Sequence, residues 1–147
     1  MLRKIIACAL ALVLMSSASI CVFATDERQL IAEQSAPGAK YTSISTMSLG
    51  INFKGSTATG KIIISTKKTA EIDRIVVSVK LMKVGSSTPV KSWGNSTLYK
   101  TSTDEFFWAD SYNVTSRGTY YFSATIKTYR GNTLVETTTV ESGRATY

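Results

Sequence analysis

Apolar and polar residues alternate at every second position in two long stretches of the chain. The first stretch places four apolar residues on one side: Met47, Leu49, Ile51 and Phe53. The second repeats the pattern with Ile75, Val77, Val79 and Leu81. A period of two is typical of a β-strand with one buried face, whereas a helix would scatter these residues around its axis. We therefore predict two strands, each with one face in the core.

Further strands are predicted between and after these two. Ile62-Ile63-Ile64 is a continuous apolar run, which indicates either a strand covered on both faces or a core strand with one buried outer residue. Residues 105–113 and 119–129 are expected to be strands rich in aromatic residues. Arg130-Gly131-Asn132 then predicts a tight hairpin, because Gly and Asn adopt positive φ at little cost, and residues 133–140 return antiparallel.

Pro89 marks one edge of the fold. A missing N–H group is tolerated at a sheet edge, so residues 89–93 are predicted as a short edge strand that Gly94-Asn95 ends. Residues 98–101 are expected as another short edge piece. The pattern gives seven or eight short strands and no long helical segment to cross between parallel neighbours. It therefore predicts an all-β antiparallel sandwich or barrel.

The first 24 residues have the features of an export signal. Arg3 and Lys4 form a positive start, residues 5–15 are an apolar run, and the stretch closes on Ala24, a small residue that signal peptidase accepts. We expect cleavage there, and hence a secreted, extracellular protein with no stable membrane span. Retention of the signal as an anchor is the alternative left open, because an uncut apolar stretch of about 20 residues spans a bilayer.

Residues 25–40 differ from the rest in being rich in Glu, Gln and Ala, and they close on Pro37-Gly38. They are predicted to be a flexible or partly helical tether, and residues 41–147 to be a single β-domain. Loss of Arg3 and Lys4 with the signal reduces 17 basic residues to 15, against 10 acidic ones, for a net charge of +5. This charge favours weak attraction to anionic envelope polymers, but no basic stripe indicates nucleic-acid binding.

The run Ser116-Arg117-Gly118-Thr119-Tyr120-Tyr121-Phe122 resembles the start of strand F in immunoglobulin-like and fibronectin type III sandwiches. The resemblance implies an immunoglobulin-like β-sandwich in which Tyr120 hydrogen-bonds back to the upstream chain. It also implies that Phe122 takes the inward position of the cysteine found in antibody domains. Trp93 departs from that pattern, because it follows the strand at residues 75–81 rather than lying within it.

Several features taken together resemble small uncharacterised secreted proteins of Gram-positive bacteria. They are the export signal, the start at Tyr41, Trp93 near the middle, the blocks Tyr112-Asn113-Val114 and Gly118-Thr119-Tyr120, and the late Glu136. The similarity is one of strands and turns and contains no site motif. It therefore implies a fold and says almost nothing about activity.

The composition excludes several kinds of catalytic and metal site. The chain has no histidine, and Cys8 and Cys21 both lie in the export signal. Cysteine nucleophiles, Ser-His-Asp triads and zinc sites built from imidazole or thiolate are therefore excluded from the exported chain. We expect no catalytic residue, no metal and no cofactor. The acidic residues Asp104, Glu105 and Asp110 leave a carboxylate-dependent hydrolase open as an alternative of low weight.

The aromatic residues give the one positive indication of function. Two of the predicted strands carry aromatic residues on both faces, so some of these side chains cannot reach the core. Gathered on a solvent-facing sheet surface, they would form a flat platform for sugar rings or peptide side chains. The candidate ligand-binding residues are Phe107, Trp108, Tyr121, Tyr129 and Lys127. The alternative is that they pair across strands or are covered by the tether.

These observations predict a secreted, monomeric, non-catalytic module that binds a ligand. The expected partner is a cell-wall glycan, another cell-envelope polymer or another extracellular protein. The second hypothesis is a protein–protein interaction module in which an open edge strand at residues 90–93 pairs with another chain.

Overall fold

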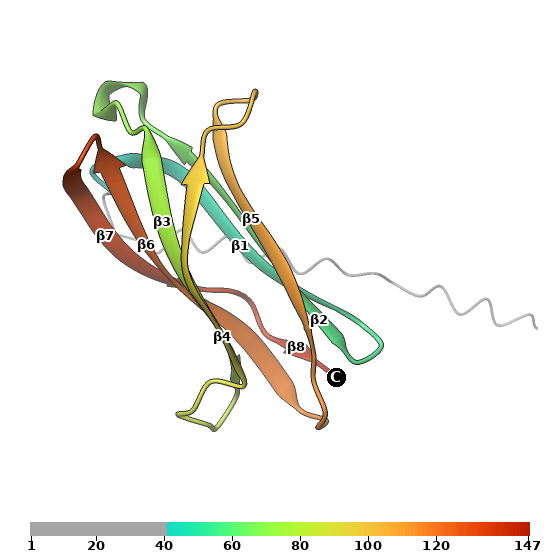
Figure 1. Ribbon diagram of the computed structural model, residues 1–147. Helices are drawn as coiled ribbons and strands as arrows, with labels where there is room; N and C mark the ends of the chain where they lie inside the picture. The colour runs from blue at the N-terminus through green and yellow to red at the C-terminus, as the bar shows by residue number, and fades with distance from the viewer. Residues whose placement is uncertain (1–40) are drawn as a thin grey trace, which may run out of the picture.

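The computed structural model describes residues 41–147, which form eight strands and one short 3₁₀ turn (Figure 1). In chain order these are β1 (Ile44–Lys54), β2 (Thr57–Thr66), η1 (Lys68–Ala70), β3 (Arg74–Lys83), β4 (Lys91–Tyr99), β5 (Glu105–Asn113), β6 (Thr119–Arg130), β7 (Thr133–Glu141) and β8 (Ala145–Thr146). The predicted export signal and tether, residues 1–40, lie outside the described residues. Between residues 41 and 147, no helix has the length and apolarity needed to cross a bilayer.

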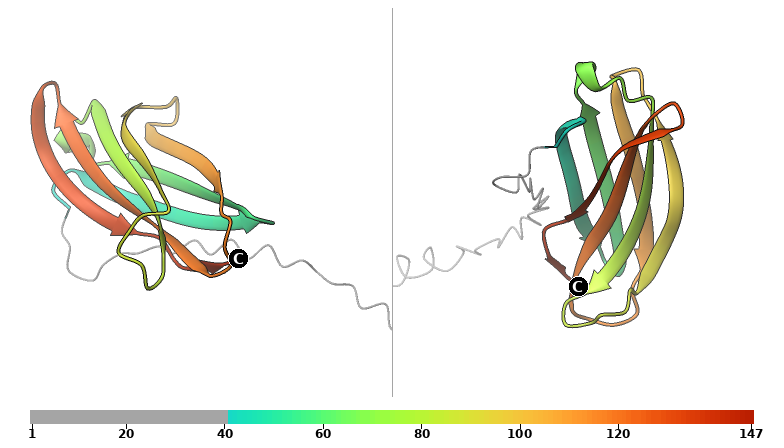
Figure 2. Two further views of the ribbon diagram at one scale, coloured as in Figure 1. Left: turned by 60° about the horizontal axis from the view of Figure 1, so that its bottom comes forward. Right: turned by 90° about the vertical axis from the view of Figure 1, so that its left-hand side faces the viewer.

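The strands form two antiparallel sheets that pack against each other (Figure 2). One sheet has three strands in the order β1-β2-β5. The other has five strands, in the order β4-β3-β6-β7, with β8 paired to β6. This arrangement confirms the predicted all-β antiparallel sandwich of about eight strands.

The core lies between the two sheets and is built from alternate residues of each strand. In β3 the four predicted inward residues are all buried: Ile75, Val77, Val79 and Leu81. In β6 the inward residues are also buried: Tyr120, Phe122, Ala124 and Ile126. In β1, Leu49 and Ile51 are buried, and Met47 and Phe53 pack against the core at its margin. The predicted faces of these strands are therefore confirmed.

The apolar run in β2 takes the second of its two expected arrangements. Ile62 and Ile64 are buried between the sheets, whereas Ile63 is half-buried on the outer face of its sheet. Ile63 lies in register between Ser48 on β1 and Phe107 on β5. The run is thus a core strand with one partly covered outer residue.

The prediction that Gly94-Asn95 ends a strand is wrong. β4 runs without interruption from Lys91 to Tyr99, and its register with β3 shifts between Val77 and Val79. The shift places two residues of β4 opposite Ser78, whose hydroxyl donates a hydrogen bond to the Asn95 side chain (2.6 Å). An extra residue of this kind is a β-bulge, which bends a strand without terminating it.

Three aromatic rings join the two sheets where the edge strands β4 and β5 lie close together. The ring centroids of Trp93 and Trp108 are 5.7 Å apart, and those of Trp93 and Phe122 are also 5.7 Å apart. The Phe122 ring lies against the backbone of Gly60 on β2, where a Cβ atom would come within 2.8 Å of it. Gly60 is therefore the residue that leaves room for the ring. This inward placement of Phe122 agrees with the expectation from the resemblance.

Tyr120 ties the start of β6 to the preceding loop. Its ring is fully buried, and its hydroxyl donates a hydrogen bond to the backbone carbonyl of Ser116 (2.5 Å). The predicted hydrogen bond from Tyr120 to the upstream chain is thereby confirmed.

Glu136 on β7 holds the first described residues of the domain. Its carboxylate accepts hydrogen bonds from the backbone N–H groups of Thr42 (3.1 Å) and Ser43 (2.9 Å), and from the Ser43 hydroxyl (2.6 Å). The Ser43 hydroxyl also lies 2.9 Å from that of Thr128. Partial burial raises the pKa of this carboxyl, but the hydrogen bonds from Ser43 and Thr42 and the charge of Lys67 lower it more. The pKa of Glu136 therefore lies below its ordinary value of 4.5.

Candidate binding surface

The five residues predicted to bind a ligand do not lie on one surface. Trp108 points into the core and is only 7% exposed. Phe107 is 46% exposed on the outer face of the three-stranded sheet. Tyr121, Lys127 and Tyr129 lie on the outer face of β6, in the five-stranded sheet. The predicted platform therefore divides into two surfaces on opposite sides of the molecule, and Trp108 belongs to neither.

The division follows from where the chain changes sheets. β5 and β6 are adjacent in sequence, but β5 pairs with β2 and β6 pairs with β3. Outward-facing residues of the two strands consequently point in opposite directions. On β6 itself, Lys127 and Tyr129 are neighbours on one face, whereas Tyr121 lies toward the other end of the strand, opposite Met82.

A row of four side chains crosses the outer face of the five-stranded sheet near one end. Arg74 on β3 is in register with Tyr99 on β4 and with Tyr129 on β6, and Tyr129 is in register with Leu134 on β7. Paired residues of antiparallel strands point to the same face, with Cβ atoms about 4.5–5.5 Å apart. The order across the sheet is Tyr99, Arg74, Tyr129 and Leu134, which we call the aromatic row.

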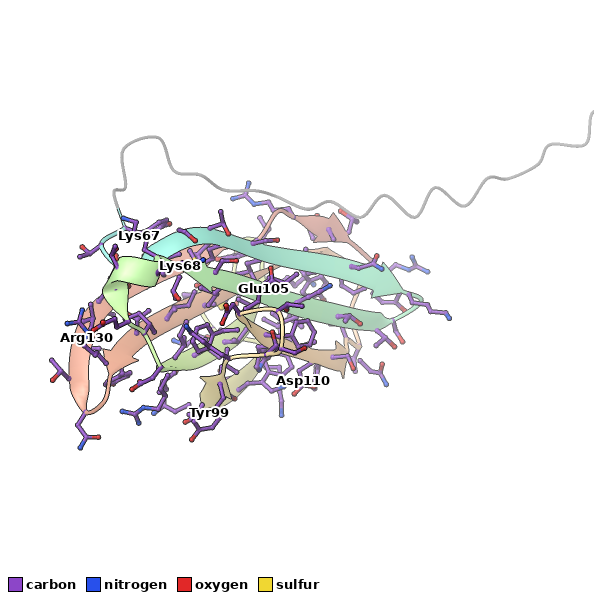
Figure 3. All side chains as sticks on the ribbon, turned by 90° about the horizontal axis from the view of Figure 1, so that it is seen from above. Lys67, Lys68, Tyr99, Glu105, Asp110 and Arg130 are labelled. Carbon is purple, nitrogen blue, oxygen red and sulfur yellow. The ribbon has the colours of Figure 1, made fainter. Side chains whose placement is uncertain are left out.

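The two ends of the aromatic row are open to solvent. Tyr99 is 70% exposed and Leu134 is 49% exposed, the highest values among the large apolar side chains of residues 41–147. In Figure 3 the Tyr99 side chain projects away from the ribbon. Isolated exposed apolar residues are ordinary, but here two of them end one row that also contains the Tyr129 ring and the Arg74 side chain packed on it.

The centre of the aromatic row is held in place by its neighbours. The guanidinium carbon of Arg74 lies 4.4 Å from the centroid of the Tyr129 ring, within the range of a cation–π interaction. One guanidinium nitrogen of Arg74 also donates a hydrogen bond to the carbonyl of Gly131 (3.2 Å). The N–H group of Gly131 donates to the carboxylate of Asp73 (2.8 Å), which ties the β6–β7 hairpin to the start of β3. The Arg74–Tyr129 pair is therefore a pre-organised element of the surface.

Beside the aromatic row, the same face is lined by hydroxyl and amide groups. On β6, the next outward-facing residue after Tyr129 is Lys127, which lies opposite Val76 on β3 and Thr137 on β7. Beyond it, the Thr125 hydroxyl lies 3.4 Å from that of Thr139. Farther along, Lys80 is paired with Ser92 and Ser123. The face thus combines exposed aromatic rings, hydrogen-bonding groups and positive charge.

The outer face of the three-stranded sheet carries a smaller apolar feature. Phe107 is in register with the half-buried Ile63, and the ammonium group of Lys61 lies 5.5 Å from the centroid of the Phe107 ring. On β1, the residue opposite Ile63 is Ser48, and the next two residues on the same outer face are Gly50 and Asn52. A single exposed ring among small polar residues gives less area for stacking than the aromatic row does.

Two of the acidic residues considered for hydrolysis, Glu105 and Asp110, do not converge. Glu105 and Asp110 are both on β5, five residues apart, so alternation directs them to opposite faces of the strand. The Asp110 carboxylate accepts a hydrogen bond from the adjacent N–H group of Ser111 (2.7 Å). In the part of the chain that the structure describes, no three residues of the acidic, cysteine or histidine types are grouped as metal ligands would be.

Three members of the aromatic row were not among the predicted site residues. Arg74, Tyr99 and Leu134 lie on three different strands, far apart in sequence. Alternation indicates which of them point outward, but the register that aligns them with Tyr129 depends on the pairing of four strands. No local signal in the sequence carries that information.

Comparison with models of known protein families gives no match for this chain. Comparison with curated protein sequences gives none either.

Proposed function

We propose that this chain is a secreted, non-catalytic module that binds a cell-envelope glycan along the aromatic row. The observation that carries the proposal is the alignment of Tyr99, Arg74, Tyr129 and Leu134 across four strands, with both ends exposed. Tyrosine rings present flat apolar faces with a polar tip, which suits them to pack against sugar rings. The hydroxyl groups next to the row supply hydrogen-bond partners for a polar ligand.

We further propose that the sandwich is immunoglobulin-like, of the fibronectin type III kind. Support comes from the strand order β1-β2-β5 facing β4-β3-β6-β7, and from the hydrogen bond of Tyr120 to Ser116 at the start of β6. Domains of this kind present flat sheet faces and loops for binding. Their architecture is compatible with many functions, so the binding role depends on the surface and not on the fold.

Extracellular location is part of the proposal and depends on the export signal in residues 1–24. The signal has the charge pattern, the apolar length and the small closing residue that signal peptidase requires. The absence of histidine from the chain, and of cysteine after residue 24, favours binding over catalysis.

The positive groups beside the aromatic row favour an anionic glycan as the ligand. Arg74, Lys127 and Lys80 all lie on the outer face of this sheet. Attraction between these groups and an anionic polymer would be screened over about 8 Å at physiological ionic strength. Binding should therefore weaken as salt is added.

A pull-down with bacterial cell-wall sacculi tests the proposal. Sacculi with their anionic polymers should retain the protein, and chemically stripped sacculi should retain less. Tyr99→Ala should weaken retention about 30-fold, because truncating an aromatic residue that anchors a ligand costs about 2 kcal/mol. The matched control is Phe107→Ala, which removes an exposed ring from the opposite face. Equal retention of both variants and the parent protein would refute the role of the aromatic row.

A further inference from the structure

Apart from the two-residue β8, each sheet of the sandwich has two edge strands, and three of these four carry features that discourage pairing with another chain. β4 has the bulge at residues 94–95, and β7 has a register shift opposite residues 128–129. β5 carries the charged residues Glu105 and Asp110. Bulges and charges of this kind are the usual protection of exposed edges.

The edge formed by β1 lacks such protection over most of its length. Its register with β2 shifts only between Ile44 and Thr46 and is regular from there to Lys54. Residues 47–53 contain no charged residue and no proline. Within residues 41–147, β1 is paired with β2 alone, and Figure 2 shows it at the margin of its sheet. In this part of the chain no strand pairs with the other side of its backbone, and at its end the Phe53 ring stacks on the Tyr147 ring (centroids 5.8 Å apart).

The pattern of apolar and small polar residues along this edge is symmetric about Gly50. In an antiparallel pairing of two such strands centred on Gly50, Met47 lies opposite Phe53 and Leu49 opposite Ile51. The core-facing residues of one strand therefore meet those of the other. On the outer face, Ser48 meets Asn52, so no like charges are brought together. Lys54 would lie opposite Thr46, which is also uncharged.

We infer that the protein is a dimer rather than the monomer expected from the sequence, and that β1 is the dimerisation edge, which pairs antiparallel with β1 of a second copy of this chain. The pairing joins the two three-stranded sheets into one continuous sheet and satisfies the open backbone groups of both edges. It also covers the margin where Met47 and Phe53 are only partly buried. The contact is isologous, since each strand uses the same residues, and it closes with two-fold symmetry.

The symmetry has a consequence for the binding surface. The two-fold axis of an antiparallel strand pair stands perpendicular to the sheet, so the corresponding faces of the two copies point in the same direction. Both aromatic rows would then face one side of the dimer. If the proposed glycan function holds, the dimer would bind a polymer surface through two linked sites, with higher avidity than one site gives. The dimer itself does not depend on that function.

Sedimentation of the exported protein, purified from a bacterial host that expresses the full chain, tests the inference. The protein should show a concentration-dependent dimer at loading concentrations up to about 1 mM, because an edge-strand contact is small and weak. The double variant Ser48→Lys with Asn52→Lys places lysines opposite each other at both ends of the pairing. Like charges in directly opposed positions are destabilising, and we expect at least a tenfold larger dissociation constant.

Two further samples make the result specific. The variant Ser48→Glu with Asn52→Glu should also be monomeric, and an equal mixture of the Lys and Glu variants should form a heterodimer. The matched control is Ala109→Lys with Ser111→Lys, which adds the same charge to the outer face of β5, the other edge of this sheet, and should leave the dimer intact. A parent protein that stays monomeric, or a mixture that fails to associate, would overturn the inference. If the parent protein dimerises but is not retained by sacculi, the proposed function is refuted and the dimer is not.

Discussion

The strands β4 and β6 both carry aromatic residues on the inner face of their sheet and on its outer face. Inside, Trp93 and Phe122 pack against each other and against Trp108 of the opposite sheet. Outside, strand register aligns Tyr99 with Arg74 and Tyr129, Arg74 packs on the Tyr129 ring, and Tyr99 is largely open to solvent. The difference indicates that the inner residues determine stability, whereas the outer ones are free to serve in recognition.

The largest effect is expected where the inner aromatic cluster meets the facing sheet. Gly60→Ala would place a methyl group 2.8 Å from the Phe122 ring, which Trp93 and Trp108 hold in position. Overpacking of this kind costs about 1–3 kcal/mol, so we expect the free energy of unfolding in urea to fall by that amount.

The control is Gly50→Ala on β1, in the same sheet but facing outward, where no atom lies within 4 Å of the added group. Here the alanine should be neutral or stabilise by up to about 1 kcal/mol, because it reduces the entropy of the unfolded chain. If both variants unfold at the same urea concentration, the Phe122 ring does not exclude a larger residue from position 60.

The next effect concerns Glu136, at the margin between the two sheets. Glu136→Gln removes the charge that accepts hydrogen bonds from Thr42 and Ser43, and we expect a loss of about 1–2 kcal/mol at neutral pH. Glu141→Gln, an exposed position on the same strand, is the control and should change stability little.

The stability that the Glu136 carboxylate contributes should disappear as the pH is lowered. Because the pKa of Glu136 is below 4.5 in the folded protein, the carboxylate stabilises the fold fully above the ordinary value. As the pH falls below 4.5, the unfolded chain takes up the proton first, and the contribution disappears as the pH passes through the lower folded value. The parent protein should therefore lose more stability than Glu136→Gln over this acid range. If the free energies of unfolding of the two proteins fall in parallel as the pH is lowered, the lowered pKa of Glu136 is contradicted.

A smaller effect is expected from removing one hydroxyl from the inner face. Tyr120→Phe keeps the buried ring and deletes the hydrogen bond to Ser116, at a cost of about 0.5–1.5 kcal/mol. The adjacent Tyr121 lies on the outer face, so Tyr121→Phe is a matched control with an expected change close to zero. Thermal unfolding of both variants would show whether the corner hydrogen bond distinguishes these neighbours.

The sequence predicts the strands and their buried faces because alternation is a local property. The inward residues of β3 and β6 could be named from periodicity alone, and the hairpin at Gly131-Asn132 from the residue types that tolerate positive φ. The error at Gly94-Asn95 has the same origin. Gly and Asn signal a break in regular structure, but a bulge and a chain end give the same local signal.

The aromatic row could not be predicted in the same way, because it depends on which strands become neighbours. Alternation correctly separates Phe107 from Trp108, and Tyr121 from Tyr120, but it does not show that β5 and β6 belong to different sheets. The contact between Gly60 and Phe122 and the alignment of Arg74 with Tyr99 and Tyr129 are likewise non-local.

The smallest effect on stability is expected at the most exposed aromatic residue. Tyr99→Ala removes a side chain that makes no contribution to the core, so the free energy of unfolding should change by no more than about 0.5 kcal/mol. Phe107→Ala, on the opposite face, is expected to behave alike in the same unfolding experiment. A variant that loses sacculus binding while keeping its stability separates recognition from folding. A loss of several kcal/mol at Tyr99 would instead mean that the outer row supports the fold, and the contrast between inner and outer aromatic residues would fail.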